Sequence, residues 1–212
     1  MIPFVTFVSF DTETTGLDPN KDEIIELAGV KFTLEKKDQR LVAKTLATYS
    51  SLVKPSMFIP ADATRVNNIT NQMVENAPQI KTVLQGFFKF AGLSSILIAH
   101  NAPFDNSFIS RAIKKNGLIL PKNPVIDSLK LFKKILPEAT SMKLSEVARK
   151  LSSQINLQLS SDQLHRALYD CEVLKEVVTA SLRKRFQEKE LAMDQALQNL
   201  EKIHGPSLTF QT

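Results

Sequence analysis

The sequence predicts an α/β fold in which helices flank a mixed β-sheet. Strand-like apolar runs follow one another at the start of the chain, as in an antiparallel meander, and later strands alternate with helical segments. A third observation is a long apolar stripe at helical spacing near the end of the chain. With 212 residues and 43% hydrophobic content, the chain is long enough to bury a core.

The first predicted strand covers residues 4–10 and is apolar on both alternating faces, which is typical of a central strand buried on two sides. Gly16 and the following Asp-Pro-Asn cluster end it. The next expected elements are a strand at 24–32, a charged connection at 35–40, a weaker strand at 43–53, and a loop-rich stretch at 55–80 with one short helix from Asn71 to Glu75, capped by Thr70.

In the second half of the chain, apolar residues at helical spacing alternate with short apolar runs typical of strands. We expect a helix at 79–91, a strand at 96–99, a helix around 106–116, a strand at 125–127, helices at 129–136 and 143–151, a loop at 152–163, and a long helix whose apolar face runs from Leu164 to Leu182. Beyond residue 185, the spacing of Phe186, Met193, Leu197 and Leu200 predicts a second amphipathic helix, followed by a tail.

Composition and charge bear on the location of the protein and on its binding partners. No apolar run approaches the length of a membrane helix, and no basic segment precedes the N-terminal apolar run, so we expect neither a membrane protein nor a signal peptide. The single cysteine, Cys171, excludes an internal disulfide and suits a cytoplasmic location. The net charge is +5, and residues 111–150 contain ten Lys or Arg against three acids. That segment predicts a polyanionic partner, although a solvated charged face is the more common explanation of such runs.

Two acids follow the first strand at alternate positions. Asp11 and Glu13 point to the same face because the side-chain period of a strand is two. Two neighbouring carboxylates repel each other, and a bound divalent cation is the usual reason to keep them together. Taken alone, the pair is explained about equally well as a solvated strand end.

Two further acids are expected near the same edge of the sheet. Asp105 follows the strand at 96–99 at the start of a helix, where it could also serve as a cap, and Asp170 lies near the start of the long helix. Four carboxylates without a histidine or cysteine cluster favour hard, oxygen-seeking ions, Mg²⁺ or Mn²⁺, over zinc. Acid-rich sites with two such ions serve phosphoryl chemistry.

His165 is a candidate general base. It precedes Asp170 by five residues, so the two side chains would diverge if both were helical, and we expect His165 on the loop before the helix. An ordinary histidine pKa near 6.5 suits proton abstraction from water. A partly exposed loop histidine is the competing explanation.

Three segments together resemble the motifs of the DEDDh 3′–5′ exonucleases, and the similarity extends over residues 5–180. They are Asp11-Thr12-Glu13-Thr14-Thr15-Gly16, His100-Asn101-Ala102-Pro103-Phe104-Asp105 and His165-Arg166-Ala167-Leu168-Tyr169-Asp170. Within this family the chain is most similar to the proofreading epsilon subunits of bacterial DNA polymerase III. All four acids and the histidine match in order and spacing, which is far more specific than one short motif.

The resemblance implies a ribonuclease H-like fold with a mixed five-stranded sheet, and two-metal hydrolysis that releases nucleoside 5′-monophosphates from 3′ ends. Asp11, Glu13, Asp105 and Asp170 would hold two Mg²⁺ or Mn²⁺ ions, with His165 as the general base. The segments around Thr12 and Thr14 would receive the terminal nucleotide, and His100 and Asn101 would organise the site. Phe104 would either stack on terminal bases or pack in the core.

One segment departs from the family pattern. Relatives often carry Val-His-Gly-Ile after the third strand, whereas this chain has Val66-Asn67-Asn68-Ile69. Asn67 can form hydrogen bonds but cannot carry charge. The substrate contact expected at Asn67 therefore differs from that of the family.

The resemblance divides the chain into an exonuclease domain at 1–184 and a C-terminal helix and tail at 185–212. The tail, Gly205-Pro206-Ser207-Leu208-Thr209-Phe210, is similar to the hexapeptides by which polymerase subunits bind the sliding clamp, but it lacks the leading glutamine. We expect an unstructured tail, with a polymerase subunit, a clamp or a second copy as conceivable partners of the helix and tail.

The expected substrate is the 3′ end of single-stranded DNA. Two alternatives remain at this point: the same chemistry on RNA, as in oligoribonuclease-like or RNase T-like relatives, and a non-catalytic scaffold that binds nucleic acid or a polymerase. Contacts with the 2′-OH decide between DNA and RNA. The complete set of four acids and His165 argues against the scaffold.

Overall fold

The computed structural model describes residues 5–37, 40–137, 141–155, 166–189 and 208–210. His165, most of the loop expected at 152–163, and most of the helix expected after residue 185 lie outside these ranges.

Five strands form one mixed sheet in the order β3-β2-β1-β4-β5, which confirms the predicted fold. The strands are β1 (Thr6–Thr14), β2 (Ile24–Lys37), β3 (Arg40–Leu52), β4 (Ile96–Ala99) and β5 (Val125–Asp127). The first three are antiparallel, whereas β4 runs parallel to β1 and β5 runs parallel to β4. The strand that carries Asp11 and Glu13 is therefore the central strand, as expected.

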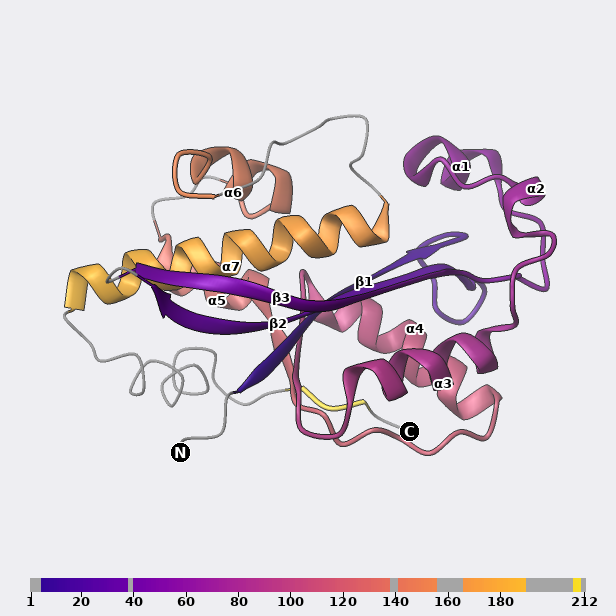
Figure 1. The fold of residues 1–212 in the computed structure, drawn as a ribbon. Coiled ribbons are helices and arrows are strands. Elements are labelled where there is room, and N and C mark those ends of the chain that lie inside the picture. Colours follow the sequence, from indigo (N-terminus) through magenta and orange to yellow (C-terminus); the bar gives the residue numbers. More distant parts are fainter. Residues whose placement is uncertain (1–4, 38–39, 138–140, 156–165, 190–207, 211–212) are drawn as a thin grey trace.

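Helices cover both faces of this sheet. They are α1 (Ala61–Asn67), α2 (Asn71–Val74), α3 (Ile80–Ala91), α4 (Ala102–Lys115), α5 (Ser128–Ile135), α6 (Leu144–Lys150) and α7 (Ala167–Lys189). Figure 1 shows β1, β2 and β3 with helix α7 on one side and helices α3 and α4 on the other.

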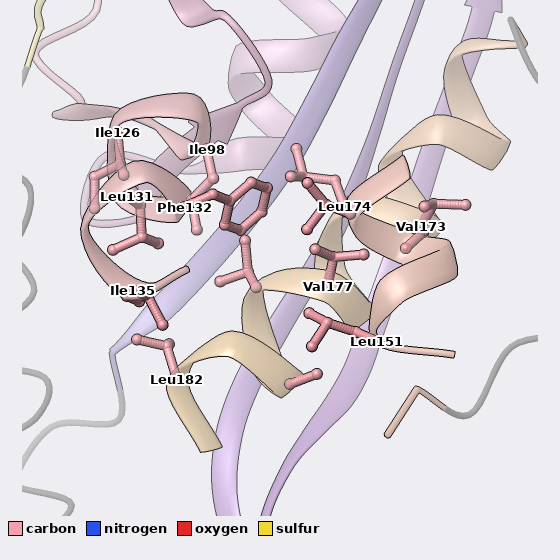
Figure 2. Close-up of a cluster of buried hydrophobic side chains, with 14 of the residues drawn as sticks. Ile98, Ile126, Leu131, Phe132, Ile135, Leu151, Val173, Leu174, Val177 and Leu182 are labelled. Carbon is pink, nitrogen blue, oxygen red and sulfur yellow. The ribbon is translucent and has the colours of Figure 1, made fainter. Parts of the chain in front are cut away.

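On one face of the sheet, Phe7 of β1 belongs to a cluster of buried hydrophobic residues from β4, α5, α6 and α7. Figure 2 shows Phe132 of α5 in this cluster with Leu174 and Val177 of α7. On the other face, Val8 and Phe10 pack against α3 and α4. Alternate side chains of β1 thus pack into the hydrophobic cores on the two faces of the sheet, as expected for a strand buried on both sides.

Three element boundaries differ from the prediction. Residues 61–67 were expected as loop but form α1. The only buried side chain of α1 is Asn67, so the sequence shows no apolar stripe there. The charged stretch at 35–40, expected as a connection, largely belongs to the long β2–β3 hairpin, in which Glu35 pairs with Val42 and Lys37 with Arg40. Helix α4 starts at Ala102, earlier than expected, because Pro103 is tolerated in a first helical turn that needs no donor there.

The basic segment does not form a single stripe. Some of its cations lie on α4, which packs on one face of the sheet, and others lie on α5 and α6, which pack on the opposite face. The rest lie on the connections between these helices. Arg111 donates to Asn20, and Arg149 pairs with Glu146 at 2.8 Å. Much of the positive charge that predicted a polyanionic partner is therefore spread over a solvated surface.

The end of the chain contradicts the expectation of an unstructured tail at residues 208–210. Leu208 and Val125 exchange two backbone hydrogen bonds of 2.9 Å, so the tail adds an antiparallel bridge to the outer edge of β5. Phe210 is only 5% exposed and contacts Phe88 of α3 with 5.6 Å between ring centroids. Burial of this aromatic ring stabilises the docked position.

Helix α7 continues without a break through the boundary expected after residue 184. Among the described parts of the chain, no helix has the length and hydrophobicity that a membrane span requires.

Candidate active site

Three carboxylates meet where β1 ends. Asp11 and Glu13 of β1 and Asp170 of α7 each place a carboxylate oxygen within 4.8 Å of the others. Asp11 and Glu13 alternate with Thr12 and therefore face α7 together. Asp170 lies in the first turn of α7, which begins at Ala167. The structure thus brings together three of the four acids that the sequence singled out, in a group that could hold a cation.

The fourth acid, Asp105, approaches from the other side of β1. It lies in the first turn of α4, is 2% exposed, and accepts hydrogen bonds from the backbone N–H of Thr12 at 3.0 Å and from its hydroxyl at 2.7 Å. Thr12 thus uses its side chain to hold Asp105.

The pKa values of Asp11, Glu13 and Asp105 are raised above their usual range. Burial raises the pKa of Asp11 well above its usual value, and the charges of Asp105, Glu13 and Asp170 raise it further. Burial, followed by repulsion from Asp170, raises the pKa of Glu13 to about 8. Burial also raises the pKa of Asp105 to about 7, against the opposing effect of the Thr12 hydrogen bonds. Such a set can be fully ionised near neutral pH only when cations offset the repulsion, so the donor set fits divalent ions that prefer oxygen ligands.

An ion pair between a buried glutamate and a partly exposed arginine lies beside this cluster and was not predicted from the sequence. Glu26 of β2 is 2% exposed and lies directly opposite Glu13 in the strand pairing. Its two oxygens accept from the Arg166 guanidinium at 2.8 and 3.2 Å. The available signal was the single acid within the apolar run Ile24-Ile25-Glu26-Leu27.

A second unpredicted residue, Asp127, organises the turn between β4 and α4. Its Oδ1 atom accepts from the backbone N–H groups of Asn101, Ala102 and Leu129 at 3.1–3.3 Å. Asn101 adopts a left-handed conformation with φ of 63°, which asparagine tolerates better than most residues.

His100 lies on the same turn and is partly buried. Its Nδ1 atom is 2.9 Å from the Ser128 hydroxyl, and burial lowers its pKa. A neutral His100 thus helps to fix the turn that leads to Asp105.

The remaining predicted substrate residues form contacts within the protein. The Thr14 hydroxyl donates to the carbonyl of Gly16 at 2.6 Å. Asn67 is 2% exposed, donates to the carbonyl of Thr14 and accepts from the N–H of Ile69. These bonds tie the end of α1 to the end of β1 and so shape the rim of the site.

Phe104 is partly buried and packs against Phe108 with 5.0 Å between centroids. This geometry shows the core contact of Phe104 and leaves part of the side chain accessible. Substrate contact by Thr12, Thr14, Asn67, His100, Asn101 and Phe104 remains a prediction.

Comparison with known proteins agrees with this site. The family profile described as exonuclease, of the RNase T type, matches residues 8–178. The chain is 36% identical over 185 residues to the PolC-type DNA polymerase III of Clostridium perfringens, covering 87% of this chain and 12% of that protein. It is 40% identical over 172 residues to the PolC-type DNA polymerase III of Thermotoga petrophila, covering 81% and 11%. The chain therefore spans only a small part of the length of these relatives.

Solved structures show the same fold. Exonuclease X in complex with 5′ overhanging duplex DNA superposes with a TM-score of 0.63 at 26% identity, covering 94% of this chain and 99% of that one. E. coli exonuclease I in complex with a dT13 oligonucleotide superposes with a TM-score of 0.64 at 17% identity, covering 92% and 44%. With the matching family profile, the carboxylate cluster and the shared fold, the chain belongs to the RNase T exonuclease family, as a DEDDh-type 3′–5′ exonuclease domain related to PolC-type DNA polymerase III.

Proposed function

We propose that the protein removes nucleotides from the 3′ end of single-stranded DNA by divalent-metal-dependent hydrolysis, and that it does so in replication proofreading. The observation that carries the proposal is the group formed by Asp11, Glu13 and Asp170, with Asp105 fixed beside it by Thr12. This arrangement concentrates negative charge at the end of a central strand, where ligand sites of open α/β sheets gather.

Asp11, Glu13 and Asp170 would hold the cations, with Asp105 completing the set from α4. Two Mg²⁺ or Mn²⁺ ions bound there would supply Lewis-acid activation of water and offset the charge of the scissile phosphate. The protein's own contribution is positioning: Thr12 orients Asp105, and Asp127 fixes the turn that places α4.

His165 immediately precedes the described start of the α7 region, since Arg166 and Ala167 follow it in the chain. We assign it the role of general base that takes the proton of the attacking water. We propose that Thr12, Thr14, Asn67, His100, Asn101 and Phe104 belong to the part of the site that receives the terminal nucleotide. Asn67 is only 2% exposed and would act there through its bond to the Thr14 carbonyl.

DNA is the favoured substrate because the solved exonucleases with this fold include a complex with overhanging duplex DNA and one with a dT13 oligonucleotide. Proofreading is favoured by the similarity to PolC-type DNA polymerase III. The same site chemistry would also hydrolyse RNA, so a 3′–5′ exoribonuclease is the alternative within this class. A scaffold without activity is disfavoured, because it would retain the repulsion among these carboxylates without using it.

The predicted division into an exonuclease domain at 1–184 and a helix and tail at 185–212 stays a proposal, as does binding of the tail by a polymerase subunit or a sliding clamp. Any such partner that took Leu208 and Phe210 would first have to displace them from β5 and α3. A cytoplasmic location likewise remains a proposal.

The test is hydrolysis of two 5′-labelled oligonucleotides of identical sequence, one DNA and one RNA, with chromatography of the products. Faster shortening of DNA with release of deoxynucleoside 5′-monophosphates supports the proposal. Faster cleavage of RNA would assign the protein to the ribonuclease branch, and binding without cleavage of either strand would favour the scaffold.

A further inference from the structure

We propose that Glu26 and Arg166 are positioning residues that set the start of α7 and thereby hold Asp170 beside Glu13. This inference rests on the proposed function of the site. It assigns a role to the ion pair between the buried Glu26 and the partly exposed Arg166, which neither the sequence motifs nor the carboxylate cluster explains.

The placement of Glu26 is unfavourable unless it is paired. Its carboxylate lies opposite that of Glu13 on the adjacent strand, and like charges at opposed strand positions are destabilising. Burial to 2% exposure adds to this cost, since a buried charge needs a partner and hydrogen bonds. Arg166 supplies both through a two-bond contact, the geometry in which a guanidinium binds a carboxylate most strongly.

Glu26 also binds the helix itself. The backbone N–H of Ala167, the first residue of α7, donates to Oε2 of Glu26 at 3.1 Å. This N–H is one of the donors that a helix leaves without an internal acceptor, and an anion is favoured at that end. The same carboxylate therefore fixes both the residue before α7 and the residue that begins it.

The first turn of α7 transmits this position to the site. The N–H of Asp170 donates to the carbonyl of Arg166 at 3.1 Å, so the two residues are locked in helical register. A shift of Arg166 away from Glu26 would consequently move the Asp170 carboxylate away from Glu13. The Arg166 side chain is 39% exposed, and ion pairs with a solvent-exposed member contribute little net stability, so a geometric role accounts for this pair better than stabilisation does.

The test compares Glu26→Gln, Arg166→Met and the double variant with wild type. Mn²⁺ affinity is measured by calorimetry on the folded full chain, and kcat and KM are measured on single-stranded DNA. We expect the affinity for Mn²⁺ to fall about 10–100-fold, the usual effect of losing a group that orients a metal ligand. We expect kcat to fall while KM for DNA changes little, and the double variant to be no worse than the poorer single variant, because both substitutions break one unit.

Arg183→Met is the matched control. Arg183 is a buried arginine at the far end of α7, where it donates to the carbonyls of Leu41 and Gln154. Its loss should lower the melting temperature without changing Mn²⁺ affinity. Arg166→Lys, which keeps the charge but not the two-bond geometry, should restore part of the affinity that Arg166→Met loses.

Several outcomes separate the two proposals. Wild-type Mn²⁺ affinity in folded Glu26→Gln and Arg166→Met would overturn the positioning role. So would a loss of Mn²⁺ affinity in Arg183→Met equal to that in Arg166→Met, with the two variants melting at the same temperature. If wild type cleaves no nucleic acid, the proposed function fails, and the Mn²⁺ affinities still decide the positioning role. If Glu26→Gln does not fold, the comparison of Arg166→Lys with Arg166→Met decides it.

Discussion

Thr12 binds one oxygen of Asp105 with both its backbone N–H and its hydroxyl, at 3.0 and 2.7 Å. A residue between two candidate metal ligands on β1 thus anchors the candidate ligand that arrives from α4. From the sequence, Thr12 was predicted only to contact substrate. The structure shows that it also connects β1, which carries Asp11 and Glu13, to Asp105 of α4.

Thr12→Val should test this contact with little change in volume. The variant loses the hydroxyl bond to a buried carboxyl group, so we expect turnover to fall about tenfold and the free energy of unfolding to fall by about 1.5–3 kcal/mol. Steady-state kinetics and urea denaturation measure the two effects. Thr12→Ser keeps the hydroxyl and should retain most activity, whereas a fully active Thr12→Val would show that the bond does not position Asp105 for catalysis.

Asp11→Asn should abolish hydrolysis while raising the melting temperature in EDTA. The substitution removes a proposed cation ligand, and it also removes a partly buried charge that repels Asp105, Glu13 and Asp170. Asp62→Asn, at an exposed acid of α1, is the control and should change neither quantity. Hydrolysis retained by Asp11→Asn would remove Asp11 from the catalytic set.

The stability of the metal-free protein should decrease as pH rises through the neutral range. The folded state raises the pKa of Glu13 from 4.5 to about 8 and that of Asp105 from 3.8 to about 7. Folded protein therefore binds these protons more tightly than unfolded chain, and the stability they contribute is complete below about pH 4 and is lost as pH rises through 7 and 8.

Melting temperatures in EDTA from pH 5 to 9 check this expectation. Glu13→Gln should flatten the upper part of the decrease, and added Mg²⁺ should raise the melting temperature more at pH 8 than at pH 5, because cations bind the ionised carboxylates. A melting temperature in EDTA that rises steadily from pH 5 to 8 would contradict the assigned pKa directions.

His165→Ala should lower turnover by about 10²–10⁴-fold, the range for loss of a general base. Mn²⁺ affinity should stay close to that of wild type, because the carboxylates that we assign as ligands remain. Rapid-quench kinetics on single-stranded DNA, with calorimetry for the metal, separate the two quantities. An unchanged rate would reassign His165 to an ordinary loop position.

Phe210→Ala should destabilise the protein by about 3 kcal/mol, as expected for truncation of a buried aromatic ring. The ring is 5% exposed and contacts Phe88, so its loss leaves a cavity beside α3. Ile119→Ala, at a side chain that is 94% exposed, is the control and should have little effect. Equal unfolding free energies for wild type and Phe210→Ala would show that the tail does not dock in solution.

Much of this site was predictable from the sequence because its signals are local. The apolar run at 4–10 predicted a central strand, and period-two spacing placed Asp11 and Glu13 on one face. Asp105 was predicted near them because it follows a strand at the start of a helix, where the sites of α/β sheets gather. The structure adds the reason: β4 is parallel to β1 and ends at the same edge.

Other features depend on contacts between distant segments. Glu26 and Arg166 are separated by 140 positions, and nothing in either local pattern requires them to pair. The tail bridge depends on the open edge of β5, which is known only once the strand order is known. Helix α1 was not predicted because its residues are mostly polar and exposed, so its sequence has no apolar stripe at helical spacing.

The most direct test of the central claim is digestion of a 5′-labelled single-stranded DNA by wild type and Asp11→Asn, each in Mg²⁺, in EDTA, and in EDTA followed by excess Mg²⁺. We predict a ladder that shortens from the 3′ end only with wild type and only when Mg²⁺ is available. Equal shortening by Asp11→Asn, or shortening that persists in EDTA, would contradict a metal-dependent exonuclease site at the end of β1.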